Sequence, residues 1–188
     1  MVDTQLRPEG VNFAPVTEAM ASVKREDFVA EGSRPVAYVD RTVPMADGRF
    51  LSGPVVTGRL LTALTPLEGE RALVVGCGTG YSAAILKLMG LKVLGLESSP
   101  KLAARARELG VDVVEGPLEE GWKSKAPYQL ILIDGAVEYI PDAIIAQLTD
   151  SRRDGTKMRP SRIEGPSCRQ RSISLSRISG FQPHTLLP

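Results

Sequence analysis

The sequence predicts an α/β fold in which a mostly parallel sheet carries helices on both faces. From residue 70 onward, short apolar runs alternate with segments of helical pattern. The apolar runs are continuous in Val, Leu and Ile, which is typical of strands buried on both sides. A glycine-rich turn, "GCGTG", follows the first of these runs, at the position where many α/β proteins bind a ligand.

The chain divides into three parts. Residues 1–69 form a mainly helical extension, because Pro15 and Pro54 each stand where a first helical turn tolerates proline. Residues 70–150 form the α/β core. Its expected strands are 71–76, 92–97, 111–116 and 128–135, and its expected helices are 81–90, 98–110 and 141–148, the second of them with Ser98 or Ser99 as N-cap.

Residues 151–188 differ from the rest in composition. They contain eight Lys and Arg against two acids and seven serines, with no long apolar run, so we expect them to be disordered or poorly packed. The sheet would then be truncated at its C-terminus and its fourth strand would be an unpaired edge, which favours aggregation and an inactive product. Two origins are open: a segment read out of frame, or a natural basic tail that contacts nucleic acid or a partner. We favour the first, because the tail lacks aromatic interleaving and any RNA-binding motif.

The composition excludes several kinds of chemistry. Two cysteines and one histidine cannot build a Cys/His metal cluster, and the lone His184 near the end is a poor basis for a Ser-His-Asp triad. A net charge of +1 argues against bulk nucleic acid as a partner. No long apolar segment predicts a membrane span, no secretory signal is evident, and distant cysteines suggest a reducing cytoplasm.

The glycine turn favours a ligand without a pyrophosphate. Gly76, Gly78 and Gly80 can adopt positive φ and let a ligand approach the backbone, but the third glycine comes one residue too early for the dinucleotide fingerprint. Glu97 ends the next strand, where an acid can accept hydrogen bonds from both ribose hydroxyls; alternatively it is a solvated acid or supports the following helix. Cys77 is best explained as a small residue in a crowded turn.

These residues resemble a known family. "ALVVGCGTGY" followed by Glu97 is similar to the S-adenosylmethionine-binding motif of Rossmann-like methyltransferases. The stretches "MVDTQLRPEGV", "REDFVAEGSRPVAYVDRTVPMADGRFLSGP" and "GWKSKAPYQLILIDGAVEYIPDAIIAQL" resemble protein-L-isoaspartate O-methyltransferases in the same order, over about residues 1–150. The resemblance implies a Rossmann-like methyltransferase fold, with residues 1–69 on the substrate side and residues 70–150 as the cofactor-binding core.

The resemblance also implies an activity. Such an enzyme transfers a methyl group from S-adenosylmethionine to the side carboxylate of L-isoaspartyl residues in damaged proteins, and the ester then collapses to a succinimide. Ser52 would match the active-site serine. Local sequence alone favours an N-cap for the helix entered at Pro54, and the resemblance shifts the preference to the active-site role. The cofactor residues would be Gly76, Cys77, Gly78, Thr79, Gly80, Glu97 and Asp134. Asp134 could instead cap the next segment.

The sequence departs from this family at several positions. Gly53 replaces a glutamine, "GPL" at residues 116–118 replaces G-D-G, and Gln129 replaces an acid, so the chain resembles a divergent member. Two alternatives therefore stay open, a methyltransferase acting on a small molecule and a non-catalytic cofactor-binding relic. We expect isoaspartyl proteins as partners, no nucleic acid or membrane, no metal, and a monomer.

Overall fold

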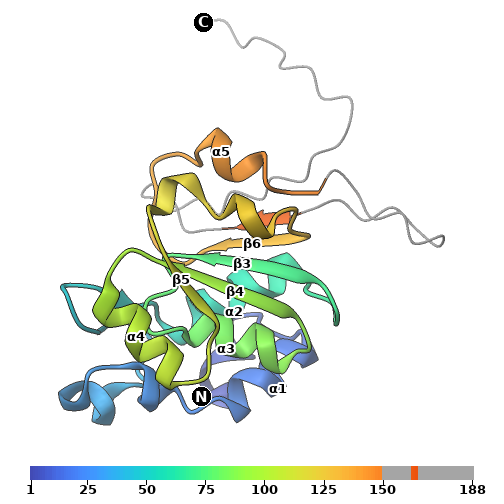
Figure 1. Ribbon diagram of the computed structural model, residues 1–188. Coiled ribbons are helices and arrows are strands. Elements are labelled where there is room, and N and C mark those ends of the chain that lie inside the picture. The colour runs from blue at the N-terminus through green and yellow to red at the C-terminus, as the bar shows by residue number, and fades with distance from the viewer. Residues whose placement is uncertain (150–161, 165–188) are drawn as a thin grey trace, which may run out of the picture.

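The computed structural model describes residues 1–149 and 162–164, and its central feature is a five-stranded parallel sheet ordered β5-β4-β3-β6-β7 (Figure 1). The strands are β3 (Arg71–Val75), β4 (Lys92–Glu97), β5 (Val113–Glu115), β6 (Leu130–Ile133) and β7 (Arg162–Glu164). Counted in chain order within this sheet, the arrangement is 3-2-1-4-5, that of a doubly wound α/β fold. The order reverses between β3 and β6, and ligands of such sheets bind beside this point at the carboxyl ends of the strands.

The strand register brings three predicted site residues to one edge of the sheet. Val75 of β3 lies opposite Leu96 of β4 and opposite Ile133 of β6. The residues that come next are Gly76, Glu97 and Asp134, so they lie side by side at the carboxyl edge. This alignment follows from the pairing of three buried apolar strands and explains why residues far apart in sequence share one site.

Helices cover the two faces of the sheet unequally. They are α1 (Ala14–Ser22), α2 (Pro54–Leu64), α3 (Tyr81–Leu88), α4 (Pro100–Glu108) and α5 (Asp142–Ile145). In Figure 1, α1 to α4 lie on one side of the sheet and the short α5 lies on the other. Alternate strand residues serve the two sides: Ala72 and Val74 join the core beneath α1 to α4, whereas Leu73 and Val75 join a smaller core with Ile144 of α5.

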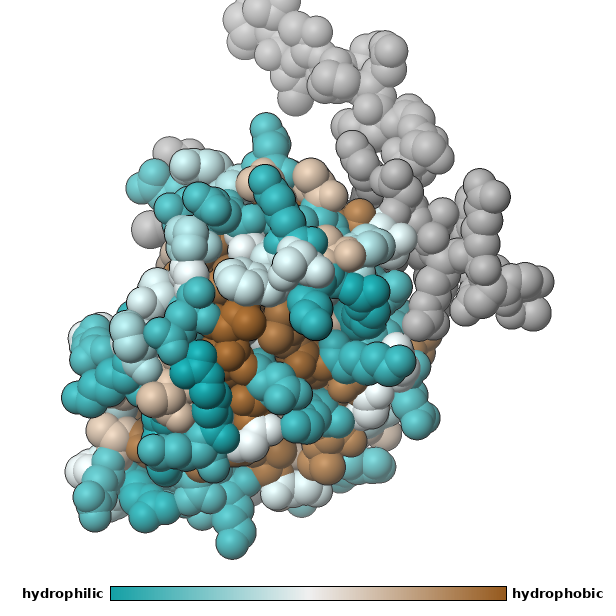
Figure 2. Space-filling model, in the orientation of Figure 1, coloured by the Kyte–Doolittle hydropathy of each residue, from teal (hydrophilic) through white to brown (hydrophobic). Residues whose placement is uncertain are grey.

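The thinner face leaves apolar surface near its middle. Leu94 of β4 and Val114 of β5 are only half-buried, although they pack against the smaller core. Figure 2 shows hydrophobic residues in the centre of the face that carries β4 and β5, framed by hydrophilic ones. The sequence predicted helices on both faces of the sheet; they cover one face fully and the other face only sparsely.

The N-terminal extension packs onto the core rather than forming a separate unit. Leu6, Val16 and Leu61 are fully buried in the same hydrophobic cluster as Val74. Between α1 and α2 the chain forms two 3-10 helices, Arg25–Phe28 and Glu31–Val36, and a small antiparallel hairpin of β1 (Val43–Pro44) and β2 (Phe50–Leu51). A short helix, Val2–Leu6, precedes α1. The hairpin was not predicted, because its strands are too short to show a period.

The predicted α/β fold is confirmed, with one strand more than expected in the parallel sheet. All four predicted strands form, and Ser99 is the N-cap of α4, accepting a hydrogen bond from the Leu102 amide. The expectation of an unpaired fourth strand is not met, because β7 pairs with β6 through Leu130↔Arg162, Ile131↔Ile163 and Leu132↔Glu164. An open strand edge offers backbone donors and acceptors to any extended segment, so three residues without a strand pattern can pair there. Both interpretations of the tail concern residues that lie largely outside the described part of the chain.

No helix in the described residues is long and apolar enough to cross a membrane.

Candidate active site

The glycine turn links the end of β3 to α3 and has the backbone conformation that glycine favours. Gly76 has a φ of +69° and Gly78 a φ of +57°, a region that residues with a side chain rarely adopt. A Cβ on Gly78 would lie 2.9 Å from the Met45 Cε, and one on Gly76 would lie 3.3 Å from an Arg49 guanidinium nitrogen. The turn therefore needs glycine both for its φ angles and for the close approach of the segment that crosses it.

Glu97 binds the glycine turn from the end of the neighbouring strand. Its side chain is fully buried, and Oε2 accepts a hydrogen bond from the Gly78 amide at 2.7 Å. Oε1 accepts from the amides of Ser98 and Ser99 at 2.9 and 3.0 Å. The arrangement holds one carboxylate at the carboxyl edge of the sheet, and the interpretation of Glu97 as a solvated acid does not hold in this structure.

A cleft of about 480 Å³ opens beside the turn, between the ends of β3 and β6. This volume lies within the range of small-molecule sites. The cleft is at the reversal of strand order, where the topology predicts a ligand. Its lining includes Arg49, Gly76, Leu118, Asp134 and Tyr139.

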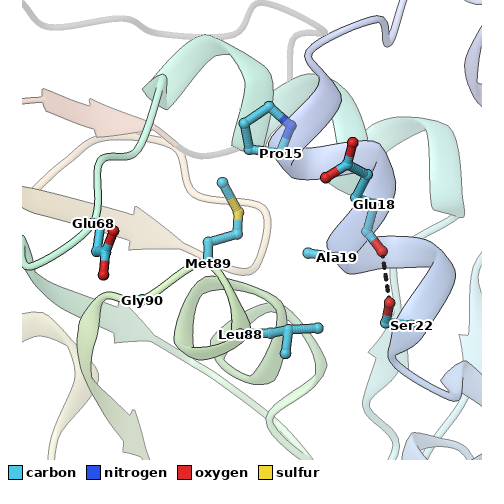
Figure 3. Close-up of a pocket in the computed structure, with 8 residues that line it drawn as sticks. All are labelled: Pro15, Glu18, Ala19, Ser22, Glu68, Leu88, Met89 and Gly90. Carbon is cyan, nitrogen blue, oxygen red and sulfur yellow. Dashed lines mark hydrogen bonds between the residues drawn. The ribbon is translucent and has the colours of Figure 1, made fainter.

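A second groove lies at the opposite edge of the sheet (Figure 3). It has a volume of about 400 Å³ and is lined by α1 on one side and the end of α3 on the other, through Pro15, Glu18, Ala19, Ser22, Glu68, Leu88, Met89 and Gly90. Glu68 and Gly90 precede β3 and β4, so this groove is at the amino ends of the strands. It contains none of the predicted site residues.

Asp134 follows the last residue of β6 and lines the cleft. Burial raises the pKa of Asp134, whereas a hydrogen bond with the Ser82 side chain and the charges of Arg25 and Arg49 lower it. Two guanidinium groups of the N-terminal segment thus favour the charged carboxylate, whereas burial and the charge of Glu97 oppose it. The structure places it beside the turn, as a residue at the switch point should be.

Ser52 does not cap α2, which corrects one of the two readings of its role. The N-cap of α2 is Gly53, without a side-chain hydrogen bond, and the Asp40 carboxylate accepts from the Val55 amide at 3.0 Å in its place. Ser52 is half-buried, and its backbone carbonyl accepts a hydrogen bond from Arg25.

Arg25 connects Ser52 to the glycine turn. Its fully buried guanidinium donates to the Ala37 carbonyl at 2.6 Å and to the Ser52 carbonyl at 2.5 Å. The guanidinium carbon also lies 4.9 Å from the centre of the Tyr81 ring, at the start of α3. Burial lowers the pKa of Arg25, and the nearby Tyr81 and Asp134 act in the opposite direction and raise it. Arg25 Nη1 and the Tyr81 hydroxyl are both buried without a hydrogen-bond partner among the described residues.

Thr79 and Cys77 face different surroundings within the turn. The Thr79 hydroxyl donates to the Phe28 carbonyl at 2.6 Å, which fastens the N-terminal segment over the turn. The Cys77 thiol is buried against the sheet, where a Cβ on Gly95 would lie 2.7 Å from its sulfur. Burial, together with Glu97 and Asp134, raises the pKa of Cys77 well above its usual range. A nucleophilic thiolate is therefore not favoured, as the sequence suggested.

Sequence reasoning did not identify Arg25, Arg49 or Leu118 as parts of the site. Arg49 lies 48 residues from its partner Glu97, and Arg25 lies 27 residues from Ser52. Both lie in the stretch "REDFVAEGSRPVAYVDRTVPMADGRFLSGP" that resembles the family, but the resemblance gave a role only to Ser52 in this stretch. The folded N-terminal segment brings Arg49 to the cleft and Arg25 to the Tyr81 ring at the start of α3.

Comparison with known proteins identifies the family. The family model of protein-L-isoaspartate(D-aspartate) O-methyltransferases matches residues 1–158. The chain belongs to this family. Protein-L-isoaspartate O-methyltransferases of Koribacter versatilis and Gloeobacter violaceus are 38% and 39% identical to it, over 81% of this chain and 72% and 78% of theirs. The resemblance noted in the sequence is thereby confirmed, and it extends a little beyond residue 150.

Solved structures of the family have the same fold. A protein-L-isoaspartate O-methyltransferase superposes with a TM-score of 0.72 at 22% identity, covering 90% of this chain and 56% of that one. A Plasmodium falciparum protein described as a member of the family, solved with S-adenosyl-L-homocysteine, superposes with a TM-score of 0.68 at 19% identity, covering 86% and 80%. The likeness to these structures confirms the Rossmann-like methyltransferase fold.

Proposed function

We propose that this protein-L-isoaspartate O-methyltransferase transfers a methyl group from S-adenosylmethionine to the side carboxylate of L-isoaspartyl residues in proteins. Family membership over most of the chain supports the reaction. One structural observation supports it most: Gly76, Glu97 and Asp134 lie side by side at the carboxyl edge of the sheet, where Gly76 and Asp134 line the cleft. Arg25 bonds the Ser52 carbonyl and contacts the Tyr81 ring, directly after the turn. A donor site and an acceptor site would thus adjoin.

The residues at the cleft fit the nucleoside part of the donor. Glu97 is a buried carboxylate at the strand end, suited to ribose hydroxyls, and the side-chain-free backbone at Gly76 allows close approach. Leu118 gives the cleft an apolar wall beside Gly76, suited to a base. We assign ribose binding to Glu97, the methionine side to the turn from Gly76 to Gly80, and a neighbouring contact to Asp134.

The chemistry needs little from the protein beyond positioning. An isoaspartyl carboxylate is already ionised near neutral pH, so no general base is required. When bound, S-adenosylmethionine supplies a methyl group on a sulfonium; an O–CH3 bond forms as the S–CH3 bond breaks and its electron pair returns to sulfur. The residues of the chain would hold the carboxylate in line and exclude water, which is the main contribution to such a transfer.

Replacing Ser52 with Ala is expected to lower kcat/KM for a peptide with one L-isoaspartyl residue by about 10- to 100-fold, because the carboxylate loses a hydroxyl donor. The affinity for S-adenosylhomocysteine should stay within about two-fold, since Ser52 lies on the substrate side. Methyl-transfer kinetics and calorimetry measure the two quantities. Ser22→Ala is the matched control, because its hydroxyl bonds only the Glu18 carbonyl on α1. Equal activity of the Ser52 variant and wild type would remove Ser52 from the site.

The same assay separates the alternatives. A methyltransferase for small molecules would bind the donor and leave the peptide unmodified. A non-catalytic relic would bind the donor and modify neither the peptide nor a small molecule.

The domain assignment and a monomeric, cytoplasmic protein belong to this proposal. Cys77 is a free, buried thiol, as suits a reducing compartment.

A further inference from the structure

Arg49 crosses the glycine turn and pairs with Glu97. It belongs to the loop between β1 and β2, and its Nη1 lies 3.2 Å from Glu97 Oε1. Its Nη2 lies 3.3 Å from the Gly76 carbonyl oxygen. The Arg49 side chain is 31% exposed whereas that of Glu97 is 0% exposed, so the guanidinium lies between the buried carboxylate and the cleft that it lines.

The pairing leaves Glu97 without room for two ribose hydroxyls. A carboxylate has about four acceptor sites, two on each oxygen. Oε1 accepts from the Ser98 and Ser99 amides, from the Ser98 hydroxyl at 3.4 Å and from Arg49, and Oε2 accepts from the Gly78 amide. The amides belong to the backbone at the end of β4 and in the turn, whereas Arg49 reaches Glu97 from the cleft. A nucleoside hydroxyl that approaches Glu97 from the cleft therefore competes with the Arg49 guanidinium.

A displaced Arg49 needs a new anionic partner at the cleft. Asp134 is close, but it already bonds the Ser82 side chain and faces the charge of Arg25. The acceptor substrate is itself a carboxylate, which a guanidinium binds in a two-pronged geometry. S-adenosylmethionine also brings a carboxylate, but an ammonium on the same carbon accompanies it, whereas the isoaspartyl carboxylate brings no cation of its own.

We propose that the nucleoside displaces Arg49 from Glu97 and that the freed guanidinium then binds the carboxylate of the isoaspartyl substrate. The inference rests on the proposed function and extends it by naming a substrate-binding residue. Both ligands favour the same state, in which Arg49 has left Glu97. Each should therefore tighten the binding of the other, with an equal factor in both directions.

The test is calorimetric titration of the full chain with S-adenosylhomocysteine, alone and with a saturating isoaspartyl peptide. Wild type should bind the nucleoside about 5-fold or more tightly with peptide present. Arg49→Gln should bind it about 3- to 10-fold more tightly than wild type when no peptide is present, because the competing ion pair is gone. The variant should also lose the peptide effect. Its peptide KM should rise about 10-fold while kcat changes little, the pattern of lost ground-state binding.

Two further variants sharpen the result. Arg49→Lys should be intermediate, because an ammonium keeps the charge and loses the two-pronged contact. Arg59→Gln is the matched control: it also breaks an Arg–Glu pair, with Glu9 at 2.8 Å, but on the exposed side of α2. It should behave as wild type in every titration.

The outcomes separate this inference from the proposed function. Weaker nucleoside binding by Arg49→Gln, or an unchanged peptide effect, would overturn the inference while methyl transfer by wild type left the function standing. Wild type that binds the nucleoside but neither binds nor methylates the peptide would count against the function and against substrate binding by Arg49. Tighter nucleoside binding by Arg49→Gln would even then support the displacement.

Discussion

Glu97→Gln is expected to weaken S-adenosylhomocysteine binding about 100-fold and to lower the free energy of unfolding by about 2–4 kcal/mol. The amide replaces one acceptor oxygen with a donor, which must face either the Gly78 amide or the amides of Ser98 and Ser99. Either choice leaves buried donors without an acceptor. The same change removes half of the acceptors proposed for the ribose hydroxyls.

Calorimetry and urea denaturation measure these two effects. Glu115→Gln is the matched control, because Glu115 ends the adjacent strand β5 but pairs with Arg107 at a partly exposed position. We expect the control to change stability by less than about 0.5 kcal/mol and nucleoside affinity hardly at all. A Glu97 variant that binds the nucleoside as wild type does would remove Glu97 from the cofactor site.

Arg25→Met is expected to lower the free energy of unfolding by about 2–4 kcal/mol and to reduce methyl transfer strongly. Two effects oppose each other. The carbonyls of Ala37 and Ser52 each lose a charge-assisted donor, which lowers the free energy of unfolding by about 1.5–3 kcal/mol per bond. Removal of Nη1, which is buried without a partner among the described residues, raises it by about 1–3 kcal/mol. The two lost bonds outweigh the single relieved group. Activity falls further because Ser52 loses the contact that positions its backbone.

Rescue by lysine distinguishes positioning from general loss of stability. Arg25→Lys keeps the charge over Tyr81 and can reach one of the two carbonyls, so stability and kcat/KM should lie between those of wild type and Arg25→Met. Arg34→Met, which removes an exposed pair with Asp27, is the control and should change the unfolding free energy little. Equal stability of Arg25→Met and wild type would contradict the account of the buried guanidinium.

The part of the candidate site that we assign to the cofactor could be proposed from the sequence because its signals are local. A buried strand, a glycine turn and an acid at the end of the next strand occur in a fixed order, and parallel pairing then aligns their ends. The pattern indicated Gly76 and Glu97, the resemblance added Asp134, and the register places the three side by side. The family motifs in the N-terminal segment added Ser52.

The substrate half depended on contacts between distant segments. The side chain of Asp40, 15 residues before Val55, accepts the hydrogen bond at the start of α2. The prediction of Ser52 as the N-cap considered only the residues next to the helix and could not include Asp40. Arg25 and Arg49 act through side chains that reach across the N-terminal segment, and any exposed arginine has the same local appearance. The pairing of β7 likewise follows from the open edge of β6 and not from the pattern of three residues.

The most direct test of the account is a calorimetric titration of the wild-type chain with S-adenosylhomocysteine. Binding at one site with a dissociation constant of roughly 1–100 μM, and much weaker binding of ATP, is the result expected if the turn and Glu97 hold a nucleoside without phosphates. The absence of binding by a folded sample, or equal affinity for ATP, would contradict it.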